Sequence, residues 1–220
     1  DITWLDMVKL IAQKNKPTIL ASGASSFDDV VRAMNTVLQV NPQICLMQCN
    51  TNYTASLENF KYIQLNVLKA YKQMYPSLVL GLSDHTPGHS TVLGAVALGA
   101  RMIEKHLTDD NDRDGPDHKF SMNGSSWQEM VERTRELENA LGDGIKRVED
   151  NEKETVIVQR RAIYCTKKLD AGHVLSADDL ITLRPCPIDG ILPSCRSEII
   201  GKRLTRNLSE GEGLKWRDLS

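Results

Sequence analysis

Residues 78–108 read LVLGLSDHTPGHSTVLGAVALGARMIEKHLT, and their pattern decides the fold class. Two short runs, 78–83 and 101–107, have the length of strands and are rich in apolar residues. Between them, residues 91–98 have a helical pattern and lead to Gly99, a residue type that often ends helices. Strand, helix and strand in this order predict a βαβ unit with two neighbouring parallel strands.

The same alternation continues on both sides of this stretch. Two earlier apolar runs of strand length cover Pro17–Ser22 and Gln43–Cys49. Helical patterns preceded by serines, which are common N-caps, cover three further segments: Phe27–Gln39, Leu57–Tyr75 and Trp127–Leu141. Residues 1–141 are therefore predicted to form an α/β domain of four βα units around a parallel sheet.

The composition and pattern of the sequence change after residue 141. Residues 142–154, GDGIKRVEDNEKE, are charged and nearly free of large apolar side chains, which predicts a linker. Residues 155–220 contain short β-like runs and a repeated pattern, L-x-x-G-x-x-L-x-x-x-D-L, at 169–180 and again at 208–219. Two copies of one pattern predict a small pseudo-symmetric β module as a second domain.

The composition limits the classes of function. A net charge of −2 argues against binding to nucleic acid or to a membrane surface. No apolar run approaches the roughly 18 residues of a membrane helix, and no signal peptide opens the chain. The five cysteines lack metal-type spacing, so reduced thiols in a cytoplasmic protein are expected. Because the chain starts at Asp1 and not at Met, we expect a fragment of a longer protein.

Histidines mark the ends of two neighbouring predicted strands. His85 follows GLSD and His106 follows IEK, and the carboxyl ends of parallel strands carry the active site in barrels and βα sheets. Alternation places Ser83 on the face of His85, and Glu104 on the face of His106. Two adjacent neutral imidazoles can share a divalent ion. From spacing alone, two ordinary hydrogen-bonded histidines remain the alternative.

A very polar loop follows His106. Residues 108–118, TDDNDRDGPDH, are typical of a solvated turn; a calcium loop is a rival, although the closing glutamate of an EF-hand is missing. Pro116 stiffens the backbone before Asp117, which would help if this carboxylate must be held in place to meet a ligand.

These segments together resemble the N-acetylneuraminate (sialic acid) synthase family, which includes legionaminic and pseudaminic acid synthases. The similarity extends in order along nearly the whole chain, through CNTNY (49–53), GLSDHT (81–86), LGAVALGA (93–100), IEKHLTDD (103–110), RDGPDHKFSM (113–122) and Arg184-Pro185. The resemblance implies the C-terminal half of a TIM (β/α)8 barrel followed by a small β-rich SAF, or antifreeze-like, β-clip domain. It also implies a domain-swapped homodimer, in which the small domain of one subunit caps the active site of the other.

The reaction implied is the condensation of phosphoenolpyruvate with an N-acetylated amino sugar such as N-acetylmannosamine, with release of phosphate. The aldehyde that becomes an alkoxide needs a Lewis acid, and the resemblance makes His85 and His106 ligands of Mn²⁺ or Mg²⁺. It implies a catalytic and sugar-binding role for Asp117. Ser83 matches a phosphate contact, and Tyr53 matches an aromatic residue that lines the sugar site together with Asp117. Arg184 corresponds to an arginine that reaches into the partner's site.

The chain departs from the family pattern at two phosphate positions and in length. Ala21 stands where the family has serine or threonine, so Ser22 is the expected substitute, and Thr51 stands where some members have asparagine. A TIM barrel takes about 250 residues, whereas only residues 1–141 precede the linker here. The four predicted strands resemble strands five to eight of the family's barrel, and the absent half would carry the family's catalytic glutamate and phosphate-neutralising lysines. The chain by itself is therefore expected to be inactive.

Three alternatives remain from the sequence. The enzyme could be a legionaminic or pseudaminic acid synthase, or the chain could be a sugar-binding module without catalysis. A third alternative is a Schiff-base aldolase, for which Lys105 is the nearest lysine at a strand end. Alternation points Lys105 away from the face of His106, which argues against the aldolase.

Overall fold

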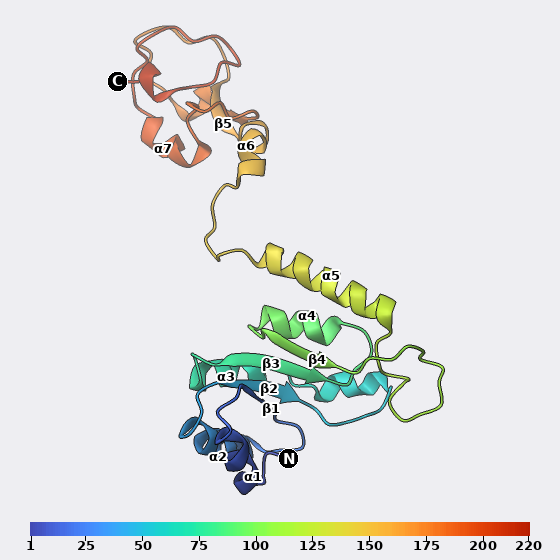
Figure 1. Ribbon diagram of the computed structural model, residues 1–220. Coiled ribbons are helices and arrows are strands. Elements are labelled where there is room, and N and C mark those ends of the chain that lie inside the picture. Colours follow the sequence, from blue (N-terminus) through green and yellow to red (C-terminus); the bar gives the residue numbers. More distant parts are fainter. The chain divides into compact units, whose positions relative to one another are not determined.

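The computed structural model describes residues 1–220, and the chain divides into two compact units, Asp1–Gly144 and Ile145–Ser220 (Figure 1). The division falls inside the stretch 142–154, whose low apolar content predicts a linker. Each unit has its own buried core. No helix is both long enough and apolar enough to cross a membrane.

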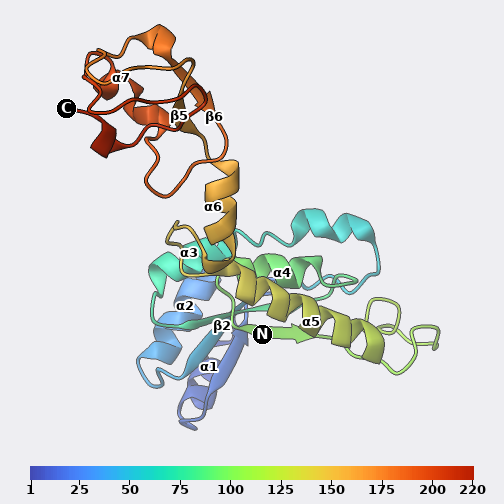
Figure 2. The same ribbon diagram turned by 90° about the horizontal axis from the view of Figure 1, so that it is seen from above.

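The first unit is built on a four-stranded parallel sheet with the order β1-β2-β3-β4, as the βα alternation predicts (Figure 1). Figure 2 shows the same structure turned by 90° about the horizontal axis. The strands are β1 (Thr18–Ala21), β2 (Ile44–Cys49), β3 (Val79–Asp84) and β4 (Met102–Lys105). The helices are α1 (Leu5–Ala12), α2 (Phe27–Leu38), α3 (Val67–Met74), α4 (Ser90–Ala97) and α5 (Gly124–Leu141), with a 3-10 helix, η1, at Leu57–Tyr62.

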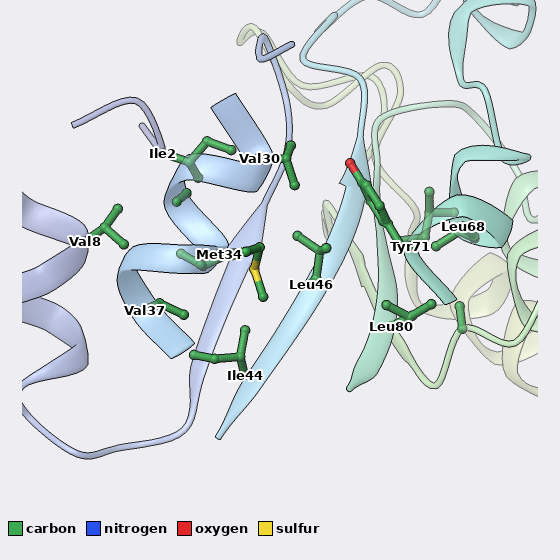
Figure 3. Close-up of a cluster of buried hydrophobic side chains, with 14 of the residues drawn as sticks. Ile2, Val8, Val30, Met34, Val37, Ile44, Leu46, Leu68, Tyr71 and Leu80 are labelled. Carbon is green, nitrogen blue, oxygen red and sulfur yellow. The ribbon is translucent and has the colours of Figure 1, made fainter. Parts of the chain in front are cut away.

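Helices cover one face of this sheet. Figure 3 shows Leu46 and Leu80 of the sheet turned towards Met34 of α2 and Tyr71 of α3, and all four are buried. Alternate residues point to the opposite face, where Ile19 of β1 is 50% exposed. The two faces of each strand therefore differ: one belongs to the helix-packed core, and the other lines the concave side on which the barrel interior is expected.

Gly81 permits close packing on this second face. A Cβ at this position would lie 2.7 Å from the carbonyl oxygen of Met102 and 3.0 Å from the side chain of Met47. The first distance is too short for a real contact and involves backbone, and the second is tight, so any larger residue would push β3 away from β4. The glycine in the GLSDHT motif thus keeps β2, β3 and β4 close together where the histidine-bearing loops begin.

Two local predictions need correction, and one helix was not predicted. The predicted helix 57–75 is interrupted: η1 and α3 are separated at Gln64, whose φ of 53° is left-handed, and Gln48 Nε2 binds the carbonyl of Ile63. The N-cap of α5 is Asn123, which forms a capping box with Ser126, so the serines predicted as caps lie inside the helix. Helix α1, whose N-cap residue Trp4 makes no side-chain capping hydrogen bond, was not predicted.

The second unit is a small β-rich domain. An antiparallel pair joins β5 (Ala162–Cys165) to β6 (Leu180–Leu183), and isolated bridges connect the remaining segments. The short helices are α6 (Lys153–Gln159) and α7 (Arg196–Ile199), with 3-10 turns η2 (Asp150–Glu152), η3 (Ala177–Asp179), η4 (Pro193–Cys195) and η5 (Trp216–Asp218).

The sequence repeat corresponds to a structural repeat. Leu169 and Leu208 exchange backbone hydrogen bonds of 2.9 and 2.8 Å with each other across the pseudo-symmetric centre. Asp179 and Asp218 are both about 1% exposed and both occupy the third position of a capping box, on η3 and η5. The predicted pseudo-symmetric β module is therefore confirmed.

Candidate active site

The candidate site lies where β3 and β4 end. The two strands are in parallel register, with Ser83 opposite Glu104 and Asp84 opposite Lys105. His85 and His106 follow these pairs, and their ring centroids are 5.2 Å apart. The prediction that the two imidazoles lie side by side is confirmed.

Alternation sorts the neighbouring polar residues onto two faces. The Ser83 hydroxyl donates a 2.8 Å hydrogen bond to Glu104 Oε1. Each of these two residues lies two positions before a histidine. The intervening residues, Asp84 and Lys105, point to the helix side and form an ion pair of 2.6 Å with almost no exposure. Lys105 is therefore bonded inside the protein and turned away from the histidines, as alternation predicts, which removes the physical basis for the aldolase alternative.

The hydrogen bonds of the two histidines leave one nitrogen of each ring available. His85 Nδ1 lies 2.9 Å from the carbonyl oxygen of Asn50, which can only accept, so Nδ1 is the donor and, in the neutral ring, Nε2 is the nitrogen with the lone pair. His106 Nδ1 faces Asp117 Oδ2 at 3.5 Å. A metal-binding histidine commonly makes this kind of contact through its other nitrogen. The nearness of Asp117 to His106 also brings together three of the predicted site residues.

Aromatic rings pack around the histidine pair. The centroid of Tyr53 lies 4.4 Å from that of His85 and 5.8 Å from that of His106, both in edge-on geometry. Phe120, which is 3% exposed, lies 5.0 Å from His106 on the same side. Sequence reasoning singled out Tyr53 but missed Phe120; the only signal was its place in the RDGPDHKFSM motif.

The loop after β4 is polar yet ordered by specific bonds. Its acids Asp109, Asp110, Asp112 and Asp114 are exposed, as a solvated turn requires. Asn111 Nδ2 donates to the carbonyls of His118 and Ser121 at 2.8 and 2.7 Å, and the Ser121 hydroxyl donates to the Asp117 carbonyl at 2.6 Å. The backbone of Met122 in turn donates to the His106 carbonyl. These bonds fold the loop back so that Asp117 and Phe120 reach the histidines.

Two predicted phosphate contacts occupy different surroundings. Ser22 is 5% exposed, and its hydroxyl donates to Gln48 Oε1 at 3.2 Å on the helix side of the sheet. The prediction that Ser22 replaces the residue at Ala21 therefore does not fit its orientation, because neighbouring positions at a strand end point to opposite faces. Thr51 is exposed and packs against Gly23, whose added Cβ would lie 2.7 Å from Thr51 Oγ1.

Arg184 belongs to the second unit. It is exposed, and its Nε donates a 2.7 Å hydrogen bond to the carbonyl of Gln159, at the end of α6. It lies in a unit separate from the histidines, so its predicted role at a partner's site concerns a second copy of the chain.

The residues present can be tested against a divalent metal. No group of three or more His, Cys, Asp or Glu side chains in the chain is arranged to hold an ion. The site nevertheless offers two adjacent imidazoles, each with Nδ1 turned to an oxygen, and a carboxylate beside one of them. This donor set fits an ion whose remaining positions are filled by water, substrate or another segment of protein.

Comparison with known proteins identifies the relatives of both units. Residues 1–146 match the NeuB family, and residues 160–220 match the SAF domain. The chain is 34% identical to an N,N'-diacetyllegionaminic acid synthase from Campylobacter jejuni, over 96% of the chain and 63% of that protein. It is 35% identical to a protein of the same name from Legionella pneumophila, over 100% of the chain and 61% of that protein.

The chain is also similar to a solved structure. The N-acetylneuraminic acid synthetase from Leptospira borgpetersenii, in complex with citrate, aligns with a TM-score of 0.63 and 26% identity over 71% of this chain and 53% of that one. The chain spans about three fifths of the length of the curated relatives it matches. On the match to residues 1–146, which cover most of the chain, it belongs to the NeuB family.

Proposed function

We propose that this chain is the C-terminal part of a nonulosonic acid synthase, an enzyme that condenses phosphoenolpyruvate with an acylated amino sugar and releases phosphate. The names of the relatives support the class of product. The observation that carries the proposal is the pairing of His85 and His106 at adjacent strand ends, with Asp117 and Tyr53 around them.

In this proposal the four βα units are the second half of a TIM barrel. Strands β1 and β4 form the edges of the sheet, and each exposes backbone groups that a further parallel strand could pair. A preceding segment would supply the first four units, together with the family's catalytic glutamate and phosphate-binding lysines. Residues 1–220 without that segment are expected to show no turnover.

The histidines would hold a divalent metal ion through Nε2, since Nδ1 of His85 is bonded to Asn50 and Nδ1 of His106 faces Asp117. When bound, the ion would act as a Lewis acid on the aldehyde of the open-chain sugar. The ion would be Mn²⁺ or Mg²⁺, because the geometry of the site and the availability of the metal decide between them more than affinity does.

The remaining side chains would bind and orient the two substrates. Asp117 is half exposed on the side of the histidines and can accept hydrogen bonds from sugar hydroxyls. Ser83 presents a hydroxyl on the same face, where it would exchange its hydrogen bond to Glu104 for one to the phosphate of phosphoenolpyruvate. Tyr53 packs on both imidazoles and would keep water from the reacting carbons.

A homodimer would complete the site. Arg184 has its Nε engaged by Gln159, which orients the guanidinium while its terminal nitrogens can meet a ligand. From the second unit of a partner copy, this arginine would contact the acyl group of the sugar. The relatives named as diacetyllegionaminic acid synthases make a diacetamido-trideoxy sugar the first substrate to test, beside N-acetylmannosamine.

The test uses the full-length protein, of which this chain is proposed to be part. Phosphate release from phosphoenolpyruvate is measured with each sugar in Mn²⁺, Mg²⁺ or EDTA, for the wild type and for His85→Ala and His106→Ala. His89→Ala is the matched control, because His89 lies at the N-cap of α4 and makes no capping hydrogen bond.

The expected result is metal-dependent phosphate release that both site variants lose and that His89→Ala keeps. Activity with only one of the sugars would decide between the sialic acid and the legionaminic or pseudaminic acid reactions. A folded protein that binds the sugars but turns over none of them would contradict the proposal and favour a sugar-binding module.

A further inference from the structure

Behind the histidine pair, on the helix side of the sheet, lies a buried ion pair that the proposed chemistry does not use. Lys105 Nζ is 2.6 Å from Asp84 Oδ2, and the two side chains are 1% and 0% exposed. Thr91, in the first turn of α4, donates its hydroxyl to the same carboxylate at 2.6 Å. Thr86 donates its hydroxyl and its backbone N–H to Asp84 Oδ1, at 3.0 and 3.2 Å.

Such a network needs a reason to exist. A buried ion pair is often no more stabilising than well-packed apolar residues, but its hydrogen bonds fix geometry strongly because each group must be satisfied. Here the two charges immediately precede the two histidines: Asp84 stands before His85, and Lys105 before His106. Any movement of the ion pair would therefore move both imidazoles.

Lys105 also holds the backbone beyond His85. Its Nζ donates a second bond, of 2.6 Å, to the carbonyl oxygen of Thr86. One ammonium group thus holds the residue before His85, through the carboxylate, and the residue after it, through the carbonyl. Since His106 is the next residue after Lys105, the same side chain links the backbone positions of both histidines.

The register of β3 and β4 also bears on the relative positions of the two histidines. Ser83 pairs with Glu104 on the histidine face and Asp84 pairs with Lys105 on the helix face, at successive positions of β3 and β4. A slip of one strand along the other would separate both polar pairs. Because the pairs lie at consecutive positions on opposite faces of the sheet, they oppose such a slip. The next residues along the two strands are the histidines themselves, 5.2 Å apart.

We propose that Asp84 and Lys105 are positioning residues, which set the separation of His85 and His106 and thereby the affinity of the pair for a divalent transition-metal ion. This inference rests on the proposed function, in which the two imidazoles are metal ligands. Neither residue touches the substrates; both act through the backbone of the ligands.

The test measures Mn²⁺ binding to the full-length protein, through the electron paramagnetic resonance signal of free Mn²⁺, with thermal unfolding recorded in parallel. The variants are Lys105→Met and the double variant Asp84→Leu/Lys105→Met, which removes both charges together. The matched control is Leu82→Ala, in the same strand and on the same face, where the side chain is 0% exposed.

Lys105→Met and the double variant are expected to raise the Kd for Mn²⁺ by about 10- to 100-fold, the usual effect of losing a group that orients a metal ligand. The double variant should recover most of the thermal stability that the single variant loses, because no unpaired buried charge remains. Leu82→Ala should unfold at lower temperature and keep the wild-type Kd.

Two results would overturn the inference. If the double variant regains Mn²⁺ affinity together with stability, or if Leu82→Ala weakens binding as much as Lys105→Met does, then affinity follows stability and not the ion pair. A wild-type protein that binds no Mn²⁺ has a different meaning: the proposed metal site itself would be wrong, and the inference would fall with it.

Discussion

The carboxylate of Asp179 is a buried group whose loss should weaken the second unit. Its side chain is 1% exposed and accepts bonds from Ser176 N at 2.9 Å, Ser176 Oγ at 2.7 Å and His173 Nε2 at 2.9 Å, with Lys167 Nζ at 2.8 Å. Burial alone would raise the pKa of Asp179, but the bonds from His173, Lys167 and Ser176 outweigh it and hold the pKa well below 3.8.

Asp179→Asn replaces one accepting oxygen with an NH₂ group that faces donors. The Lys167 side chain is 60% exposed, so its ion pair contributes only about 0–1 kcal/mol. One lost bond to a buried charged acceptor costs about 1.5–3 kcal/mol. The expected loss is therefore about 2–3 kcal/mol in the free energy of unfolding, or roughly 10–20 °C in Tm for a domain of this size.

The dependence on pH has a definite sign. Because the pKa of Asp179 is lower in the folded unit than in the unfolded chain, the stabilisation is complete above about pH 4 and is lost as the pH falls further towards the folded pKa. The difference in free energy of unfolding between wild type and Asp179→Asn should thus be largest at neutral pH and become smaller as the pH falls. The exposed neighbour gives the control: Asp178→Asn should change stability by less than about 0.5 kcal/mol.

The measurement is urea denaturation of residues 145–220, followed by circular dichroism at several pH values. Asp218→Asn tests the other copy of the repeat, since Asp218 accepts from Arg206 Nε at 2.7 Å and from Lys215 N at 3.0 Å. A loss below about 0.5 kcal/mol for Asp179→Asn, or a difference from wild type that stays constant down to acid pH, would refute the reasoning.

Three further predictions concern the first unit and the thiols. Ser83→Ala should raise KM for phosphoenolpyruvate in the full-length enzyme while Ser22→Ala leaves it unchanged, because only Ser83 lies on the histidine face; equal effects in steady-state kinetics would contradict this placement. Phe120→Ala should cost about 3–5 kcal/mol in urea denaturation, because its ring is 3% exposed, and a loss under about 1 kcal/mol would show that the loop does not pack as described. Burial raises the pKa of Cys45 to about 11, so at mildly alkaline pH a thiol reagent should modify the partly exposed Cys195 first, and rapid modification of Cys45 in the folded protein would contradict its burial.

The sheet and the histidine pair could be predicted because both follow from periodicity. Apolar runs of strand length, separated by helical patterns, require a parallel sheet, and the ends of neighbouring parallel strands must meet at one edge. His85 and His106 stand just beyond two such ends, so their proximity needed no knowledge of the loops. The same alternation correctly turned Lys105 away from them.

The orientation of Ser22 could not be predicted in this way. The run Pro17–Ser22 is apolar on both faces, so its pattern does not show which residues face the helices. A serine at its end can therefore face either side of the sheet. In the folded chain, Leu20 packs in the helix-side core and Ser22, two residues on, points the same way. A partner from another strand, Gln48, decided the outcome.

Phe120 and the loop that carries it depend on contacts between distant residues. The loop is shaped by bonds from Asn111 to His118 and Ser121 and from Met122 to His106, and none of these has a local sequence signature. The break between η1 and α3 is similar, since the Ile63 carbonyl is bound by Gln48 from the sheet. In both places tertiary hydrogen bonds override the local pattern.

The proposal that this chain belongs to an enzyme that forms a carbon–carbon bond from phosphoenolpyruvate can be tested by one measurement. The full-length protein is incubated with [3-¹³C]phosphoenolpyruvate, an acylated amino sugar and Mn²⁺, and the labelled carbon is followed by ¹³C NMR. The predicted result is conversion of the vinyl carbon into a methylene carbon of a nonulosonic acid, with release of phosphate and no reaction in His85→Ala. Labelled pyruvate without a sugar adduct, or unchanged phosphoenolpyruvate from a folded, metal-loaded protein, would contradict the proposal.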